Sequence, residues 1–225
     1  MAVYGAEITS PDGKKFVIPD YNPFTFYSKT SVYGASGAWS ATSTGVPAST
    51  PCLFFIHGDG LISNGEGAAC YMTPVNGIWH IYGRASSIGP VTWTVYIFSN
   101  RLLKDETNSA YGVQLFDAAG NIIMSNNSRP LKLEYYSPQW TADTPWFNFI
   151  QTGKKVAVLQ SICARYDPRN SNSTYFEVAY GVNSAAYGQS ILGYSYNHPD
   201  KFGPQGQVVR SYYPNILAID CSLYD

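Results

Sequence analysis

The stretch Val91–Phe98, with the sequence VTWTVYIF, decides the fold class of this chain. It consists of β-branched and aromatic residues, the types that favour extended strands. Side chains alternate across a strand, so Val91, Trp93, Val95 and Ile97 share one face, and Tyr96 and Phe98 lie on the other. Because both faces carry large apolar groups, we expect a strand that is at least half covered on each side.

Similar runs recur along the chain and are separated about every ten residues by Gly, Pro, Asn, Asp or Ser. This pattern predicts an antiparallel all-β protein with almost no helix. The predicted strands are Val3–Ile8, Lys15–Ile18, Phe24–Val32, Cys52–Ile56, Ile78–Tyr82, Val91–Phe98, Tyr111–Phe116, Asn121–Met124, Leu131–Tyr136, Val156–Ile162, Tyr175–Tyr180, Gln189–Tyr196 and Ile216–Ser222.

Composition excludes several classes of protein. Charged residues make up 13% of the 225 residues, and the 14 basic residues nearly balance the 15 acidic ones. We therefore expect no nucleic-acid partner, because phosphate binding needs excess positive charge.

No apolar run approaches the roughly 20 residues that span a bilayer, so we expect no membrane insertion. The first residues lack a secretory signal pattern, which predicts synthesis in the cytoplasm, and we expect the four cysteines to be buried thiols.

An internal repeat appears when Tyr4–Phe24 is placed over Tyr111–Leu131, an offset of 107 residues from Tyr4 to Tyr111. Each segment reads as a hairpin with a turn that ends in glycine. The identical pairs in this alignment are Tyr4/Tyr111, Gly5/Gly112, Gly13/Gly120 and Pro23/Pro130. Weaker similarities follow along both halves, including Cys52–Ile56 with Val158–Ile162.

The repeat predicts two tandem antiparallel β-sandwich domains, residues 1–105 and 106–225. The boundary is placed in Asn100–Ala110, which holds four charged residues and no strand pattern. An isolated hairpin is only marginally stable, so each copy needs further strands to bury its apolar side.

Motifs for catalysis are weak, and we expect no enzyme and no cofactor. Leu53–Gly60 resembles a strand that leads into an esterase oxyanion loop, but no G-x-S-x-G nucleophile motif accompanies it. His57–Gly60 is therefore interpreted as a turn, and His57, His80 and His198 as turn or surface residues. Phosphate-binding loops and metal-ligand spacings are absent from the sequence. A carbohydrate-active enzyme remains a third hypothesis, based only on the 15 acidic residues and the all-β class. Asp59/Glu66 and Asp143/Glu134 are near neighbours only in the chain and give no reason to choose two catalytic carboxylates.

The tryptophans can form either a core or a contact surface. Trp93 lies in a regular strand and is predicted to be in the core. Trp39, Trp140 and Trp146 lie in Gly/Ser/Thr/Pro-rich connections, where they could stack on sugars, bury into a partner or pack beneath a loop. These three are the candidate ligand-binding residues, and we name no candidate metal ligand and no candidate catalytic residue.

The opening Met1–Ile8, with Pro11–Lys14, resembles a family of small tail proteins from long-tailed bacteriophages, whose members begin with Tyr-Gly-hydrophobic-Glu and a short glycine turn. Tyr111–Asn121 resembles a downstream element of the same proteins. The first copy departs from the family at Thr9–Pro11 and Ile18–Asp20. The resemblance implies a structural virion component of the distal tail, with hub and fibre proteins as partners, and transfers no catalytic residue.

Two further expectations accompany this resemblance. Broad polar-aromatic surfaces favour self-assembly, and we expect a homo-oligomer, with a trimer as the preferred state. The alternative function is a host-surface module that binds a glycan or protein receptor through the aromatic loops. Both functions require adhesive β surfaces, so the sequence leaves the choice between scaffold and receptor binder open.

Overall fold

The computed structural model describes residues 7–9, 15–17, 23–36, 38–58, 68–85, 91–100, 114–116, 122–137, 150–159, 162–166, 176–183, 190–197 and 216–225. These residues form β-strands and their connections, with a single short 3-10 helix, η1 (Cys221–Leu223). The predicted all-β character is therefore confirmed for this part of the chain. None of its helices has the length and apolar character needed to cross a membrane.

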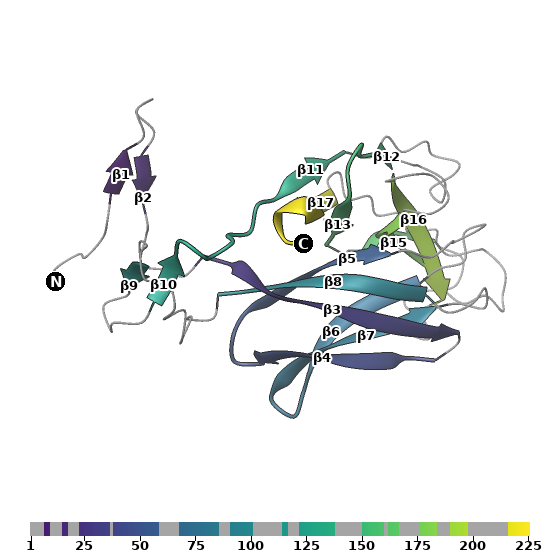
Figure 1. Cartoon of the computed structure of the whole chain (residues 1–225). Helices are drawn as coiled ribbons and strands as arrows, with labels where there is room; N and C mark the ends of the chain where they lie inside the picture. The colour runs from purple at the N-terminus through teal and green to yellow at the C-terminus, as the bar shows by residue number, and fades with distance from the viewer. Residues whose placement is uncertain are drawn as a thin grey trace.

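The strands follow one another along the chain as short to medium segments (Figure 1). Their bounds are β1 Glu7–Thr9, β2 Lys15–Val17, β3 Thr25–Ser36, β4 Ser40–Pro47, β5 Cys52–Gly58, β6 Ala68–Val75, β7 Ile78–Ala85, β8 Val91–Ser99, β9 Gln114–Phe116, β10 Ile122–Ser125, β11 Glu134–Tyr136, β12 Ile150–Gln151, β13 Val156–Val158, β14 Ile162–Tyr166, β15 Phe176–Asn183, β16 Ser190–Asn197 and β17 Ile216–Asp220.

One large sheet contains 13 of the described strands. Its main path runs β11-β17-β13-β5-β8-β3-β7-β4, and β6 also pairs with β7. The remaining strands join this path through β15, which pairs with β5, β14 and β16, and β16 pairs in turn with β12. The sheet is mixed, whereas the sequence predicted antiparallel pairing throughout. The parallel contacts are short, for example Ala35 with Arg84, where the end of β3 passes from one layer to the next.

Two layers enclose the larger core. Val46 of β4 and Ile81 of β7 pack in one buried cluster with Val32 of β3 and with Trp93 and Val95 of β8. Figure 1 shows β4, β6 and β7 as a group beside β3, β5 and β8. The face predicted for β8 is confirmed, since Val91, Trp93, Val95 and Ile97 all lie in this cluster.

The opposite face of β8 is also covered. Phe98 and Tyr96 join Phe55, Ile219 and Tyr224 in a second buried cluster. The ring of Phe98 contacts the Tyr224 ring edge-on, with centroids 4.9 Å apart. The sheet is thus buried on both sides at β5 and β8, which explains why these strands read as nearly continuous apolar runs.

The layers pack closely at Gly83 of β7. A methyl group on Gly83 would lie 2.7 Å from Cγ1 of Val32 and 2.9 Å from the Trp93 ring.

We predict that Gly83→Ala lowers the free energy of unfolding by ~1–3 kcal/mol, because the added carbon forces the layers apart. Urea denaturation measures this loss, with the exposed Gly77→Asn as control, since nothing lies within 4 Å of a Cβ there and Asn tolerates positive φ. A Gly83→Ala protein as stable as the parent would contradict this packing.

Both predicted hairpins form antiparallel pairs. β1 pairs with β2, and β9 pairs with β10, each as a two-stranded sheet that shares no strand pairing with the large sheet. Figure 1 shows them on the side of the molecule away from β15 and β16. The turn residues of both hairpins lie outside the described residues.

The two predicted domains share this large sheet. Val158 of β13 pairs with Ile56 of β5 across the predicted boundary, and each buried cluster contains residues from both halves. The described residues thus show no second domain and no repeat as such. The division into 1–105 and 106–225 stays a prediction.

Candidate functional site

Three aromatic side chains form a cluster on the outer face of the layer that contains β4, β6 and β7. Tyr71 and Tyr82 occupy directly opposite positions on β6 and β7, and their rings stack with centroids 5.1 Å apart and planes 5° from parallel. Trp39, which precedes β4, meets Tyr71 edge-on with centroids 4.8 Å apart. We call Trp39, Tyr71 and Tyr82, together with Arg84, the aromatic face.

Strand alternation explains why this face is aromatic. Cys70, Ile81 and Gly83 point inward and are buried, so Tyr71 and Tyr82, their neighbours in sequence, point outward. Trp39 is 40% exposed and Tyr71 is 42% exposed, whereas Tyr82 is partly covered. The two more exposed rings meet at 75°, so their planes are close to perpendicular.

Arg84 supplies the positive charge of the aromatic face. Its guanidinium carbon lies 5.9 Å from the centre of the Trp39 ring, within the range of a cation–π interaction. Strands β4, β6 and β7 contain no Asp, Glu or Lys, and Arg84 is their one formally charged residue apart from the histidine. An anionic group that reached this face would therefore meet a donor and no repelling carboxylate from these strands.

Of the sequence-predicted candidates, Trp39 lies on the aromatic face and is exposed rather than packed beneath a loop. Trp140 and Trp146 lie outside the described residues. Sequence reasoning missed Tyr71, Tyr82 and Arg84, although Tyr82 and Arg84 alternate with the buried Ile81 and Gly83. The predicted strand Ile78–Tyr82 could have placed Tyr82 on the outer face, but the Tyr71–Tyr82 pairing also depends on β6, which the sequence did not predict.

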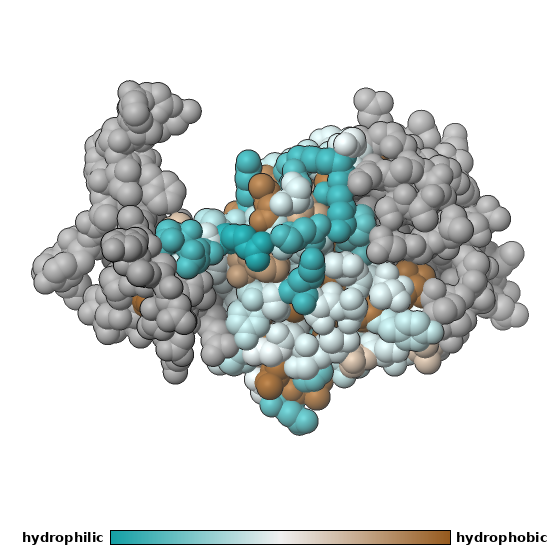
Figure 2. Space-filling view, viewed as in Figure 1, coloured by the Kyte–Doolittle hydropathy of each residue, from teal (hydrophilic) through white to brown (hydrophobic). Residues whose placement is uncertain are grey.

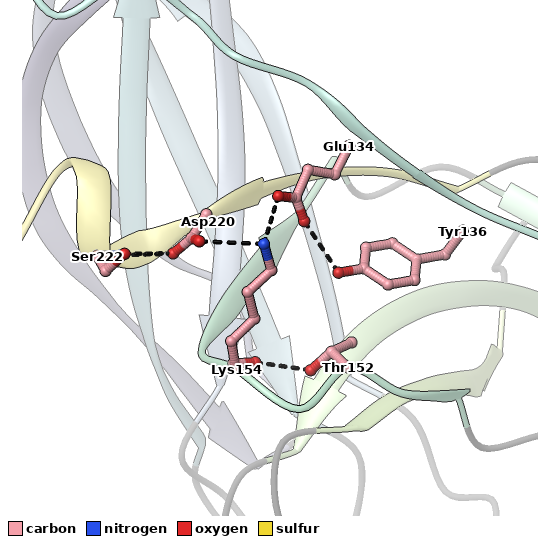
Figure 3. Close-up of polar contacts among 6 residues, drawn as sticks. All are labelled: Glu134, Tyr136, Thr152, Lys154, Asp220 and Ser222. Carbon is pink, nitrogen blue, oxygen red and sulfur yellow. Dashed lines mark hydrogen bonds and ion pairs between the residues drawn. The ribbon is translucent and has the colours of Figure 1, made fainter.

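A polar cluster connects β11 and β17 with the turn before β13 (Figure 3). Lys154 donates to Glu134 of β11 and to Asp220 of β17, while Tyr136 donates to Glu134 at 3.0 Å. Asp143, the near neighbour of Glu134 in the chain, lies outside the described residues. Glu134 shares a lysine with Asp220, an arrangement that holds β11, β17 and the turn before β13 together.

The pKa shifts in this cluster follow from its charges. Hydrogen bonds from Lys154 to Glu134 and Asp220 raise the pKa of Lys154. Burial, with the hydrogen bond to Glu134, raises the pKa of Tyr136 to about 12. A hydrogen bond from Ser222, supported by Lys154, lowers the pKa of Asp220. Lys154 and Asp220 thus stay charged at neutral pH, which suits an ion-paired clamp.

A second polar cluster surrounds Asp225. Its carboxylate accepts from Tyr96 at 2.7 Å, from Lys29 at 3.0 Å and from Lys155 at 2.9 Å. Burial alone would raise the pKa of Asp225, but these hydrogen bonds outweigh burial and lower it. Because Lys29 belongs to β3 and Lys155 precedes β13, Asp225 links residues from both halves of the chain.

The pH dependence of stability follows from these two lowered pKa values. A carboxylate whose folded pKa is depressed adds stability above its unfolded value, here 3.8, and loses it as pH falls through the folded pKa. We predict that the unfolding free energy, measured in urea, declines below about pH 4. Asp225→Asn should be less stable at pH 7 and show a shallower decline. A variant with the same acid profile as the parent would contradict this role.

The structure corrects the interpretation of His57 and Gly58 as a turn. Both are buried within β5, and His57 is 1% exposed. Its Nδ1 lies 2.7 Å from the carbonyl oxygen of Val156 in β13. A carbonyl only accepts, so Nδ1 carries the proton and the imidazole connects β5 with β13. The glycines that follow made His57 look like a loop residue, whereas the strand continues through it.

The other histidines and the cysteines fit simpler roles. His80 is partly exposed on β7 and contacts the carbonyl of Ile78, while His198 lies outside the described residues.

Cys52, Cys70 and Cys221 are thiols in partly or fully buried positions, and burial raises the pKa of Cys52 and of Cys221 to about 11. This agrees with the predicted buried thiols, apart from Cys163, whose side chain is not described. Within the described residues, no group of three or more His, Cys, Asp or Glu side chains could hold a metal ion.

Comparison with known proteins gives no relative. No family model, no curated protein and no solved structure matches this chain.

Proposed function

We propose that this chain is a structural protein of the distal tail of a long-tailed bacteriophage, a minor tail protein that assembles with the hub or fibres. The observation that carries the proposal is the pair of Tyr-Gly hairpins. The pairs that close them, Thr9 with Lys15 and Phe116 with Ile122, lie 107 residues apart, and a bulge then shifts the next pairs of the second hairpin by one residue. The equivalent closing pairs support the internal repeat on which the likeness to tail proteins rests.

The hairpins are also suited to assembly. Two-stranded sheets are marginally stable alone, and each of these pairs with no strand of the large sheet. An open strand edge can receive a strand from a neighbour through main-chain hydrogen bonds. Hub, fibre or identical subunits are the proposed partners, with a homotrimer as the expected oligomer.

We also propose that the chain is a duplication of one β-sandwich unit, divided as 1–105 and 106–225. The order β11-β17-β13-β5-β8-β3 supports this, because it reads alike from both ends. In each half of this six-strand stretch, the strand after the hairpin lies at the end (β3, β11), the last strand lies in the middle (β8, β17) and the third strand lies at the junction (β5, β13), and the full path continues from β3 to β7 and β4. The β13–β5 pairing is antiparallel, as a two-fold axis between equivalent strands requires.

The remaining strands support the same duplication. The first half forms the order β4-β7-β6, and the second contains the order β12-β16-β15. β4 and β12 are each the second strand after the hairpin, and β7 and β16 each precede the last strand of their half. The segments that leave the hairpins also meet, since Leu131 donates to the carbonyl of Phe24 at 2.8 Å. Phe24 and Leu131 are themselves 107 residues apart. In this proposal, the two units share one sheet and are not separate bodies on a linker.

Immunoblotting of purified phage particles tests the proposed virion role. We expect the protein in particles that have been washed in high salt and banded by density, at a copy number that is a multiple of three. The major capsid protein serves as positive control and a cytoplasmic host protein as negative control. Absence of the protein from banded particles would contradict the proposal.

A second candidate function is host-surface recognition, which the exposed Trp39 and Tyr71 favour. Exposed Trp, Tyr and Arg side chains are the types that contribute most to binding energy. Purified protein that neither binds host cells nor blocks infection would remove this candidate. The virion role would stand without it, because scaffold proteins need no receptor contact.

A further inference from the structure

We propose that the aromatic face, made by Trp39, Tyr71, Tyr82 and Arg84, is a binding site for a carboxylate-bearing sugar such as a uronic or sialic acid. The proposal deepens the second candidate function, host-surface recognition, by naming the ligand class and the residues. It requires neither the duplication nor a position at the tail tip.

The first step of the argument is the geometry of the rings. The Trp39 and Tyr71 rings meet edge-on, and one face of the Tyr71 ring stacks on the parallel ring of Tyr82. Cross-strand pairing holds Tyr71 and Tyr82 in place, so little side-chain freedom is lost when a ligand binds. The exposed ring surfaces match the apolar C–H face of one pyranose ring.

The second step is the surrounding chemistry. On β4, the neighbouring outward residues Ala41 and Ser43 are small and exposed, so a polar ligand can reach the rings. The exposed aliphatic Ile78 lies at the opposite end of β7 from Arg84, next to the β6–β7 turn, where Figure 2 shows hydrophobic residues at the lower edge of the molecule. A protein interface of ordinary size buries about 800 Å² per partner around an apolar centre. A compact aromatic pair bordered by small residues favours a sugar over a protein surface.

The third step is charge complementarity. Arg84 lies over the Trp39 ring, and among the described residues no carboxylate contacts it. A guanidinium pairs with carboxylates through two parallel hydrogen bonds, and β4 and β6 add no charge of either sign. A sugar stacked on Trp39 with its carboxylate toward Arg84 would satisfy both the ring and the cation.

Titration of the full chain with methyl glycosides tests the proposal. The probes are methyl glucuronide and methyl N-acetylneuraminide, with methyl glucoside and methyl galactoside as neutral counterparts. Saturation-transfer NMR reports which sugar protons lie on aromatic rings, and competition gives the Kd. We expect at least one acidic sugar to bind about tenfold more tightly than its neutral counterpart, as one charged hydrogen bond allows.

Variants assign the effect to residues. We expect Trp39→Ala and Tyr71→Ala to weaken acidic-sugar binding about tenfold or more, and Arg84→Gln to remove the preference for acidic over neutral sugars. The matched control is Tyr135→Ala on β11, since Tyr135 is also an exposed tyrosine but lies outside the aromatic face. Thermal unfolding should be similar for all variants, because the substituted side chains lie on the surface.

Three results would overturn the proposal. The first is that none of the four methyl glycosides receives saturation transfer. The second is that the parent and Trp39→Ala bind the acidic sugars with the same Kd, and the third is that neutral sugars bind as tightly as acidic ones. If Trp39→Ala instead disrupts assembly of the chain while sugar binding is absent, the face is a protein interface. Particle immunoblotting does not depend on sugar binding, so failure here and failure of the virion role can be distinguished.

Discussion

Replacing Trp93 with alanine should lower the free energy of unfolding by ~3–5 kcal/mol, the range for a large buried aromatic residue. Trp93 is 1% exposed and lies on β8 in the cluster that joins the two layers. Its ring faces Gly83, whose missing side chain makes room for it. Alanine at 93 would leave a cavity where β7 and β8 meet.

Urea denaturation followed by circular dichroism measures the effect of Trp93→Ala. Trp93→Phe is the control, because it keeps an apolar ring and should lose clearly less stability. If Trp93→Ala unfolds before it can be measured, Trp93→Phe still gives a loss that can be compared with the parent. Equal stability of parent and alanine variant would mean that the layers do not pack through this residue.

Replacing Tyr224 with alanine should cost a similar ~3–5 kcal/mol, although the residue is next to the end of the described chain. Its ring contacts Phe98 and Phe26, with centroids 4.9 Å and 5.6 Å away. Its hydroxyl donates to the carbonyl of Pro130 and accepts from the amide of Lys132. Tyr224 therefore connects β8 and β3 to the segment that leads into β11.

Tyr224→Phe separates the two contributions. It retains the ring contacts and removes only the two hydrogen bonds, so we expect a loss of about 1–2 kcal/mol in the same urea experiment. A loss as large as that of Tyr224→Ala would place the stabilisation in the hydroxyl. A negligible loss in both variants would show that the second buried cluster does not depend on Tyr224.

These residues show what the sequence could and could not predict. β8 was found because its β-branched and aromatic residues alternate between two buried faces. β4, with the sequence SATSTGVP, was missed because Ser, Thr, Gly and Pro resemble a loop, although Thr44 and Val46 point into the core. Its strand form depends on pairing with β7, which is a long-range contact and leaves no local pattern.

The candidate site was predictable only in part. Trp39 stood out because it lies in a polar connection, but its partners come from β6 and β7, more than 30 positions later in the chain. Tyr71 and Tyr82 become a stacked pair only when the β6–β7 register is known. His57 was misread for the same reason, because the glycines after it suggested a turn and its partner in β13 is far away in sequence.

Antibody-gold electron microscopy of intact phage particles tests the central proposal, a structural role at the distal tail, most directly. The antibody would be raised against the whole chain and checked on denatured particles to prove that antigen is present. Gold at the tail tip or the fibre bases is the predicted result. Gold on the capsid or along the tail tube, or no gold on particles whose antigen is accessible, would contradict the proposed role.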